Sequence, residues 1–528
     1  MEVRQPVRSL CIALLRPASI LPLTANNISI VDSPPIGLAY LAASLKKAGH
    51  RVRIIDAFGE APTQLTRDPE GYAINGLLAD ELVARIPLDV DLIGVTCMFS
   101  NSWLYYRRTI AEIAERFPHV PIVVGGEHPT ADYERLLRRV PEVACCALGE
   151  GEETMVEIAE RVACGEPFHD VAGLAVRDDQ GGVRLNEPRK RIREVDEIPW
   201  PDWESVPLAN YLDNQLTHDP FASRSMPILA SRGCPYQCTF CSSPQMFGTR
   251  WVSRDPVDVC RELKHYHHTY GARYFEFQDL TMVINRQWII DFCRQLQSEK
   301  LDIQWCMPSG TRSEALDAEV LGWMKRSGCR SFAYAAESGA PSELVRIKKK
   351  IKLPRLLASM REAVRLGLVT RCHLIFGMPG QTRREVVQTL GFVTRLALVG
   401  CHDLACYPFA PYPGSELYDR LVASGEIDTE AEDYDRVLAH NIFTDFASKR
   451  SWTPNIPGWA LGWLCIATMG YFYALQFLLR PHRTLGLLRS LIEGRPRTYL
   501  QRMVLNRLRP APVRAAVSEK WAELSQSA

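Results

Sequence analysis

The sequence has no excess of charge of either sign. Its 528 residues include 62 lysines and arginines against 61 aspartates and glutamates, so the net charge is +1 at pH 7. A chain without a strong positive field does not attract nucleic acid along its surface. It also contains neither a zinc-finger nor an RNA-binding signature. We therefore exclude nucleic acid as a partner.

The 16 cysteines lack the regular spacing of a disulfide framework. Scattered cysteines in a chain of this length indicate the reduced thiols of a cytoplasmic protein. The first residues, MEVRQPVRSLCIALLRPAS, contain a basic stretch and a short apolar run, but no small-residue cleavage site follows cleanly. A first β-strand is therefore favoured over a signal peptide.

The length of the chain predicts two or three domains. Short apolar runs alternate with helical segments up to residue 150, which predicts a doubly wound parallel sheet. The alternation returns after residue 226 and predicts a partial or full β/α barrel. We expect four regions: a Rossmann-like domain at 1–155, a charged, proline-rich linker at 156–225, the barrel at 226–415, and a mostly helical region at 416–528.

Polar and glycine-rich segments follow the strands of the first domain. Ligands of such sheets bind beyond the carboxyl ends of the strands, where glycine lets the backbone approach a bulky ligand. From residues 1–150 alone, an ordinary nucleotide-binding fold is the favoured interpretation. The candidate ligand contacts are Thr96, Ser100, Gly125, Gly126, His128, Gly149, Glu150 and Gly151.

Three cysteines lie close together in the segment ILASRGCPYQCTFCSSPQ, with the spacing C-x3-C-x2-C. Gly233 and Pro235 oppose a helix that would make these residues a buried stripe. A structural zinc site needs four ligands, and no second C-x2-C pair lies nearby. A cubane bound by three thiolates keeps one iron open for another molecule. Cys234, Cys238 and Cys241 therefore predict a [4Fe-4S] cluster.

The same segment resembles the radical S-adenosylmethionine (SAM) enzymes, whose signature is C-x3-C-x-aromatic-C; Phe240 takes the aromatic position. The resemblance continues through SGTRSEAL, AAESGA, HLIFGMPGQT and FAPYPGSELY. It implies that the open iron binds SAM, and that an electron from a flavodoxin- or ferredoxin-type donor cleaves SAM to a deoxyadenosyl radical. At the place after the cysteine segment where the family has Gly-Gly-Glu, this sequence has FQDL (277–280). The implied SAM contacts are Phe240, Asp279, Ser309, Arg312, Glu337 and Ser338.

The segments SPPIGLAYLAASLKKAGHRVRIIDA, VVGGEHPT and LGEGEET resemble the cobalamin-binding domain that precedes the barrel in many radical SAM enzymes. The chain lacks Asp-x-His-x-x-Gly, the motif that supplies a histidine ligand to cobalt in other proteins. The resemblance therefore implies cobalamin held without a histidine from that motif. We expect His128 to be a hydrogen-bonding residue and not a cobalt ligand.

Together the two resemblances imply a cobalamin-dependent radical SAM enzyme, and most directly a C-methyltransferase that acts on an unactivated carbon. One alternative is a cyclase or oxidase without methyl transfer, such as the anaerobic magnesium-protoporphyrin monomethyl ester cyclases. A methylthiotransferase would need three further cluster ligands, and Cys97, Cys145 and Cys146 lack suitable spacing. A non-enzymatic cobalamin or iron sensor would not need the SAM segments. No catalytic acid or base is assigned.

One apolar segment, 458–479, has no charged residue and is long enough to cross a bilayer. Its glycines, Gln476 and many aromatic residues also suit a helix at a membrane interface or in a substrate pocket. Eight arginines lie between 480 and 509, and they would suit an anionic membrane surface. The alternatives are a buried or pocket-lining helix, a peripheral membrane contact and a true span. The first two predict an apolar small-molecule substrate, and the second a position at the inner face of the membrane.

Overall fold

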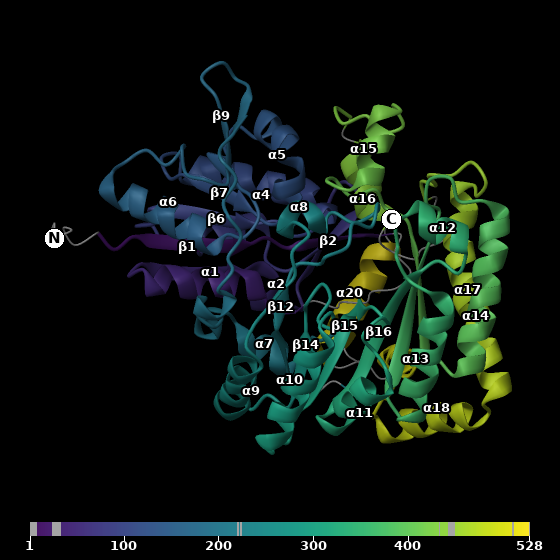
Figure 1. The fold of residues 1–528 in the computed structure, drawn as a ribbon. Coiled ribbons are helices and arrows are strands. Elements are labelled where there is room, and N and C mark those ends of the chain that lie inside the picture. Colours follow the sequence, from purple (N-terminus) through teal and green to yellow (C-terminus); the bar gives the residue numbers. More distant parts are fainter. Residues whose placement is uncertain are drawn as a thin grey trace.

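The computed structural model describes residues 8–23, 33–218, 221, 224–431, 433–441, 449–508 and 512–526. Two sheets, each covered by helices, lie side by side (Figure 1). The N-terminal sheet, in purple and blue, occupies one half of the molecule, and the second sheet, in teal and green, occupies the other. The C-terminal helices, in yellow, run along the outside of the second half and return between the two.

The N-terminal sheet has the strand order β10-β9-β8-β7-β6-β1-β3. Its parallel strands are nearly continuous apolar runs because helices cover both faces. Helices α1 (Ile36–Lys47) and α6 (Glu152–Cys164) cover one face, and α4 (Trp103–Arg116) and α5 (Glu127–Arg139) cover the other. This confirms the predicted doubly wound sheet. The parallel strands are β1 (Cys11–Arg16), β3 (Arg51–Asp56), β6 (Leu92–Thr96), β7 (Ile122–Gly125) and β8 (Cys145–Ala147).

The N-terminal domain extends further than the predicted boundary at residue 155, which falls inside α6. Strands β9 (Leu174–Arg177) and β10 (Val183–Leu185) continue the sheet antiparallel to β8, so the first part of the predicted linker 156–225 belongs to this domain. These strands have only four and three residues. Such short strands between charged segments give almost no periodic hydrophobic signal. The sequence pattern therefore does not show that the N-terminal domain continues beyond residue 155.

A small antiparallel sheet, not predicted from the sequence, is inserted in the N-terminal domain. It consists of β2 (Ser19–Pro22), β4 (Leu65–Arg67) and β5 (Tyr72–Asn75). Helix α16 (Asp433–Asn441) packs against β2, and α20 (Pro512–Gln526) packs against β4. The C-terminal region therefore contacts both halves of the molecule.

The second sheet contains six parallel strands in sequential order, with the outer helices packed each beside the next. Within the described residues β11 and β18 do not pair with each other, so the barrel is partial. This is one of the two forms, partial or full, that the sequence predicted. The strands are β11 (Ser225–Ile228), β14 (Tyr274–Phe277), β15 (Gln304–Thr311), β16 (Cys329–Glu337), β17 (Val369–Phe376) and β18 (Asp403–Pro408). The outer helices are α9 (Pro256–Tyr270), α10 (Arg286–Ser298), α11 (Ala318–Arg326), α13 (Leu353–Arg365) and α14 (Arg383–Val399).

The apolar segment forms helix α17 (Gly458–Leu479) and packs against α14 and β18. Among the described residues it is the one helix long and apolar enough to cross a membrane. Leu461, Cys465 and Phe472 are fully buried on one face, and the Gln476 amide donates to the Cys401 carbonyl. The opposite face is exposed. In this structure α17 therefore covers the edge of the barrel with one side only.

The remaining C-terminal helices are α15 (Glu416–Ala423), α18 (His482–Glu493) and α19 (Tyr499–Leu508). After α17, the Arg480 guanidinium donates to the carbonyls of Ala397 and Leu398 at 2.7 and 2.8 Å. These carbonyls belong to the last turn of α14, where carbonyls lack the usual helical partners, although the Gly400 amide also donates to Ala397. Arg480 thus fixes the end of α17 to the barrel.

Candidate functional site

The three predicted cluster cysteines lie in one loop between β12 (Ser231–Arg232) and α8 (Ser243–Phe247). All three are half-buried. The loop starts at Gly233 with φ of +85°, where a Cβ atom would lie 2.3 Å from the Arg250 carbonyl oxygen. Glycine is needed there on both grounds. The loop holds its thiols at the carboxyl end of the barrel strands.

Two cations stand beside this loop. The Arg312 guanidinium lies 3.5 Å from the centre of the Tyr236 ring, and the Lys349 ammonium lies 5.9 Å from the centre of Phe240. Burial raises the pKa of the Cys238 thiol, and Lys349 opposes this effect. Positive charge here stabilises thiolates, the form in which cysteine binds metal. The residues therefore fit the predicted cluster.

Among the described residues, no group of three or more His, Cys, Asp and Glu side chains surrounds one point as ligands of a single ion. A cubane takes one thiolate on each of three different irons, so its cysteines are spaced more widely than the ligands of one ion. The half-buried cysteine loop agrees with a cluster better than with a single-ion site.

The predicted SAM residues lie in the cysteine loop (Phe240) and at the carboxyl ends of β14 (Asp279), β15 (Ser309 and Arg312) and β16 (Glu337 and Ser338). Glu337 ends β16 with φ of +64°, a conformation that is strained for a residue other than glycine. Its carboxylate accepts a hydrogen bond from Lys349 at 2.9 Å. Ser309 is exposed, whereas Arg312 is held by Glu314 and the Lys350 carbonyl. The SAM role of these residues stays a prediction.

Two further predicted SAM residues, Ser338 and Asp279, also have internal partners. Ser338 is fully buried and donates to Glu343 at 2.6 Å. The Asp279 carboxylate accepts from the Ala230 amide at 3.2 Å and from the Ser231 hydroxyl. Burial raises the pKa of Asp279 to about 6. These contacts brace the strand ends that carry the site, and a direct contact with SAM stays a prediction.

The glycines of the N-terminal domain lie where its sheet meets the barrel. Gly126 has φ of +119°, and a Cβ atom there would lie 2.6 Å from the Cys97 carbonyl oxygen. At Gly125 the nearest atom to a Cβ would be 3.6 Å away, so this position keeps space for a ligand. Gly149 also has positive φ, and Gly151 precedes α6. The strands thus end in loops that bring bare backbone to the predicted cobalamin side.

Two exposed apolar residues stand between Thr96 and Ser100. Met98 and Phe99 are 40% and 69% exposed, although they follow a buried strand. Apolar side chains exposed beside glycine loops suit the flat face of a large ring. They belong to the candidate cobalamin surface together with Thr96. The sequence run TCMFS indicates this exposed apolar surface, because its apolar residues continue past the expected end of the strand.

Ser100 and His128 are buried beneath this loop. The His128 Nδ1 atom lies 3.0 Å from the Ser100 hydroxyl, and its ring packs on Trp103 at 4.8 Å. Burial lowers the pKa of His128 to about 3, which keeps the ring neutral. His128 thus braces the loop through hydrogen bonding and packing, and a cobalamin contact of either residue stays a prediction.

The cobalamin-side loops are bonded to both ends of the cysteine loop. Before it, Arg232 bridges Glu150 at 3.3 Å and Glu152 at 2.5 Å. After it, the Ser242 hydroxyl donates to Glu127. The local sequence pattern does not indicate these roles of Arg232, Glu152, Ser242 and Glu127, because each contact joins segments far apart in the chain. They place the carboxyl ends of the two sheets face to face.

The cysteines that a methylthiotransferase would need do not form a second site. Cys97, Cys145 and Cys146 are buried in the N-terminal sheet. Burial raises the pKa of each of these thiols, so none is poised as a thiolate. This agrees with their unsuitable spacing in the sequence.

A parallel partial barrel with a three-cysteine loop at its carboxyl end defines a radical SAM protein. The family profile described as the radical SAM superfamily matches residues 228–393, and the profile of the B12 binding domain matches residues 29–159. An uncharacterised methyltransferase of Pyrococcus horikoshii is 33% identical over 412 residues, 77% of this chain and 83% of the relative. The chain therefore belongs to the cobalamin-dependent radical SAM enzymes. This confirms the predicted fold and the predicted cofactors: the [4Fe-4S] cluster, SAM and cobalamin.

Two further proteins are similar to this chain. The anaerobic magnesium-protoporphyrin IX monomethyl ester cyclase of Cereibacter sphaeroides is 27% identical, over 74% of this chain and 60% of its own length. The structure of the methyltransferase TsrM from Kitasatospora setae, with cobalamin and a [4Fe-4S] cluster bound, has a TM-score of 0.60 and 17% identity. That match covers 79% of this chain and 75% of TsrM, and it concerns the fold.

Proposed function

We propose that this protein is a C-methyltransferase that places a methyl group on an unactivated carbon of an apolar small molecule. The observation that carries the proposal is the bonding of the cobalamin-side loops to both ends of the cysteine loop, through Arg232 and Ser242. A group carried on one side can reach a substrate activated on the other only if the two sites face each other across a short gap.

The bound cofactors supply the radical and the methyl group, and the chain's own residues position them. Cys234, Cys238 and Cys241 would hold the cluster, and Lys349 and Arg312 would keep positive charge beside it. Met98 and Phe99 expose apolar surface at the end of β6, where they would exclude water from a bound substrate. An external donor of the flavodoxin or ferredoxin type supplies the electron.

Methyl transfer and cyclisation give different co-products, and this difference tests the proposal. We expect the reconstituted protein, given SAM, cobalamin, a reductant and cell lipid extract, to form S-adenosylhomocysteine together with 5′-deoxyadenosine. We also expect a product heavier by one CH2 unit in mass spectrometry. A reaction without cobalamin is the control. Formation of 5′-deoxyadenosine with no S-adenosylhomocysteine above this control would favour the cyclase or oxidase alternative.

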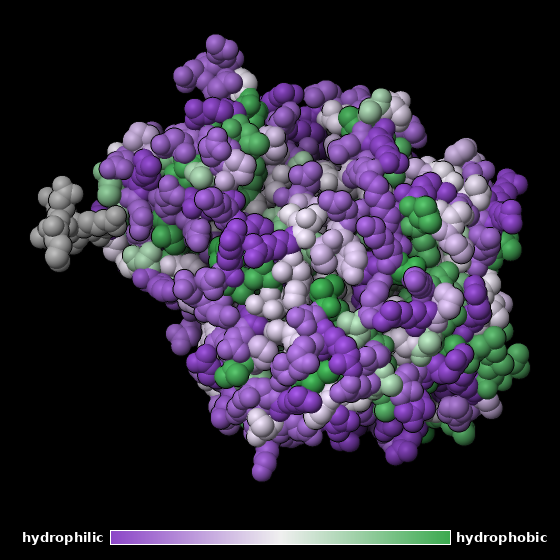
Figure 2. Space-filling view, in the orientation of Figure 1, coloured by the Kyte–Doolittle hydropathy of each residue, from purple (hydrophilic) through white to green (hydrophobic). Residues whose placement is uncertain are grey.

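A peripheral contact with an anionic membrane is the second part of the proposal, since an apolar substrate is delivered most readily from lipid. Exposed apolar residues gather over α14, α17 and α18, where Figure 2 shows green patches at the right and lower right. On α18 they share one face at helical spacing, with Arg489 beside them. A helix with an outward apolar stripe and flanking arginines is typical of an interfacial helix. The residues are Leu485, Leu488 and Ile492.

Replacing Leu485, Leu488 and Ile492 together with serine is expected to reduce binding to phosphatidylglycerol vesicles about tenfold or more. Each apolar side chain contributes up to about 1.5–3 kcal/mol when it leaves water. Co-sedimentation with vesicles measures the effect. The matched control is Leu88→Ser, since Leu88 is 79% exposed but lies in the N-terminal domain. Equal sedimentation of both variants and the wild type would contradict the membrane contact and leave methyl transfer untouched.

A further inference from the structure

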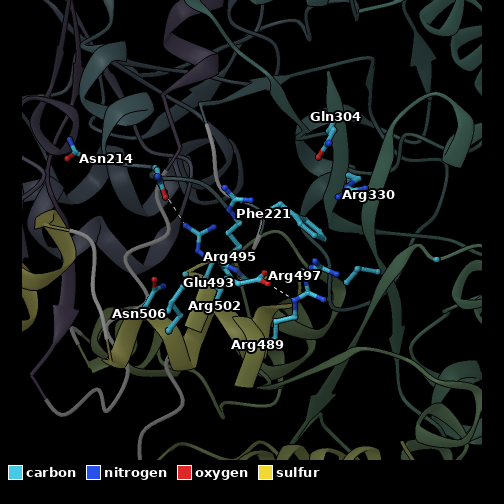
Figure 3. Close-up of a pocket in the computed structure, with 16 residues that line it drawn as sticks. Asn214, Phe221, Gln304, Arg330, Arg489, Glu493, Arg495, Arg497, Arg502 and Asn506 are labelled. Atoms are coloured by element: carbon cyan, nitrogen blue, oxygen red, sulfur yellow. Dashed lines mark hydrogen bonds and ion pairs between the residues drawn. The ribbon is translucent and has the colours of Figure 1, made fainter. Parts of the chain in front are cut away.

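A cavity of about 830 Å³ lies at the end of the barrel away from the cysteine loop. Gln304, Arg330 and Val369 line it, and these residues stand at the beginnings of β15, β16 and β17. The opposite wall comes from α18, α19 and the turn between them (Figure 3). The cluster cysteines lie at the carboxyl ends of the strands, so the cavity is a separate place in the molecule.

The lining of the cavity is strongly positive. Figure 3 shows the arginines gathered around it, one from the sheet and the others from α18, α19 and the turn between them. Among the described residues of the lining, Glu493 is the one acidic residue, and it is paired with Arg489 at 2.5 Å. The arginines are Arg330, Arg489, Arg495, Arg497 and Arg502.

Three of these arginines lack a carboxylate partner. Within the part of the chain that the structure describes, Arg330, Arg495 and Arg497 make no ion pair. The Arg330 guanidinium stacks on the Phe221 ring at 5.3 Å, and its Nε atom is buried with no hydrogen-bond partner among the described residues. The Glu493 carboxylate also attracts Arg495 and Arg497, so one carboxylate is shared among three arginines. The positive charges that remain in excess around the cavity repel each other, and a bound anion relieves that repulsion.

We propose that this cavity binds a phosphate group. The guanidinium group presents paired N–H donors that match phosphate oxygens two at a time, and several forks directed at one space suit a doubly charged anion. The group could be a lipid headgroup, since the apolar stripe of α18 begins beside the cavity, or a soluble phosphorylated compound. Both sources share the chemistry that the arginines recognise.

The distance along β16 separates this cavity from the radical chemistry. Arg330 is the second residue of the strand and Glu337 the last, and a rise of about 3.3 Å per residue puts them about 23 Å apart. The phosphate ligand therefore acts as a positioning or regulatory partner and not as the group that is methylated. The inference does not depend on the proposed methyl transfer.

The test is a binding measurement on the cofactor-loaded full chain, with no turnover as readout. Isothermal titration calorimetry with inorganic phosphate and with pyrophosphate probes the soluble source. Co-sedimentation with phosphatidylcholine vesicles, with and without phosphatidic acid, probes the lipid source. The test variant carries Arg330→Gln, Arg495→Gln and Arg497→Gln. The control is Arg138→Gln, because Arg138 is exposed on α5 and pairs only weakly with Glu134 at 3.6 Å.

We expect the wild type and the control to bind at least one of these probes, and the triple variant to bind it about tenfold or more weakly, since each lost charge-assisted bond is worth about a factor of ten. Saturable binding of free phosphate or pyrophosphate identifies a soluble ligand, and binding only of vesicles with phosphatidic acid identifies a lipid. If the triple variant does not fold, Arg495→Gln with Arg497→Gln, both exposed residues, takes its place.

Two results would overturn the proposal: no binding of any probe by the wild type, or equal binding by wild type and variant. The serine variant of the α18 stripe separates this proposal from membrane contact, since it should lose vesicle binding through its apolar face but keep any binding of inorganic phosphate.

Discussion

Replacing Cys234, Cys238 and Cys241 with alanine is expected to abolish 5′-deoxyadenosine formation and to remove iron and sulfide from the anaerobically reconstituted protein. Each thiolate binds a different iron, so the loss of one ligand already opens a second corner of the cubane. The single variants should therefore fall close to the triple variant. We expect at least about a thousandfold loss of SAM cleavage, because residues that act as one unit give losses that do not add.

Cys164→Ala is the matched control for the cysteine variants. Cys164 ends α6 in the N-terminal domain, is exposed, and has no role in the cysteine loop. This variant should keep the iron and sulfide content and the SAM cleavage of the wild type. Iron and sulfide assays together with chromatography of 5′-deoxyadenosine measure both quantities. Retention of SAM cleavage by the triple variant, or zinc in place of iron in the wild type, would contradict the cluster assignment.

The cysteine loop and most strands could be predicted because their signals are local. Gly233 and Pro235 oppose a helix through Cys234, Cys238 and Cys241, and the lack of a second C-x2-C pair nearby opposes a closed zinc site. The apolar runs of the parallel strands are continuous because both faces are buried, and a continuous run is visible without any partner. Helix α17 was also bounded correctly, since an uncharged segment ends where arginines begin.

The contacts between the two halves could not be predicted, because they depend on side chains brought together from distant segments. Glu150 and Arg232 are 82 residues apart, and Glu127 and Ser242 are 115 apart. Nothing in either local pattern indicates the other partner. The buried face of α17 could not be predicted for the same reason. The sequence shows that the helix is apolar, but its packing against α14 and β18 decides which face is buried. The hydrogen bonds of the Asp279 carboxylate with Ala230 and Ser231 could not be predicted for the same reason, and the SAM contact of Asp279 stays a prediction.

Replacing Arg232 with methionine is expected to uncouple the two halves of the protein. Arg232 and Glu152 are both about nine-tenths buried, and Arg232 also contacts Glu150 and the Tyr40 ring. Although burial opposes ionisation, Arg232 holds the pKa of the Glu152 carboxyl below its usual value. Methionine keeps much of the volume but leaves Glu152 as a buried charge without its partner. Breaking a buried pair in this way costs about 3–5 kcal/mol.

The functional consequence follows from where the bond sits. Arg232 precedes the cysteine loop but is not a cluster ligand, so the variant should still bind iron and cleave SAM. The Arg232 bridge sets the gap between the cofactor sites. The ratio of methylated product to 5′-deoxyadenosine should therefore fall about tenfold or more, because a small misplacement of reacting groups slows their reaction by such factors. Thermal unfolding of the loaded protein and the product ratio by mass spectrometry measure the two effects.

Arg286→Met is the matched control, because Arg286 also bridges two carboxylates, Asp317 and Glu319, but all three side chains are about half exposed. Exposed pairs contribute only about 0–1 kcal/mol, so this variant should match the wild type in stability and in product ratio. If Arg232→Met behaved like Arg286→Met in both measurements, the face-to-face arrangement of the two cofactor sites would not depend on this bridge. If only the stability fell while the ratio held, the bridge would serve folding alone. The drop in the ratio is therefore the decisive quantity, because it reports the distance over which the methyl group must pass.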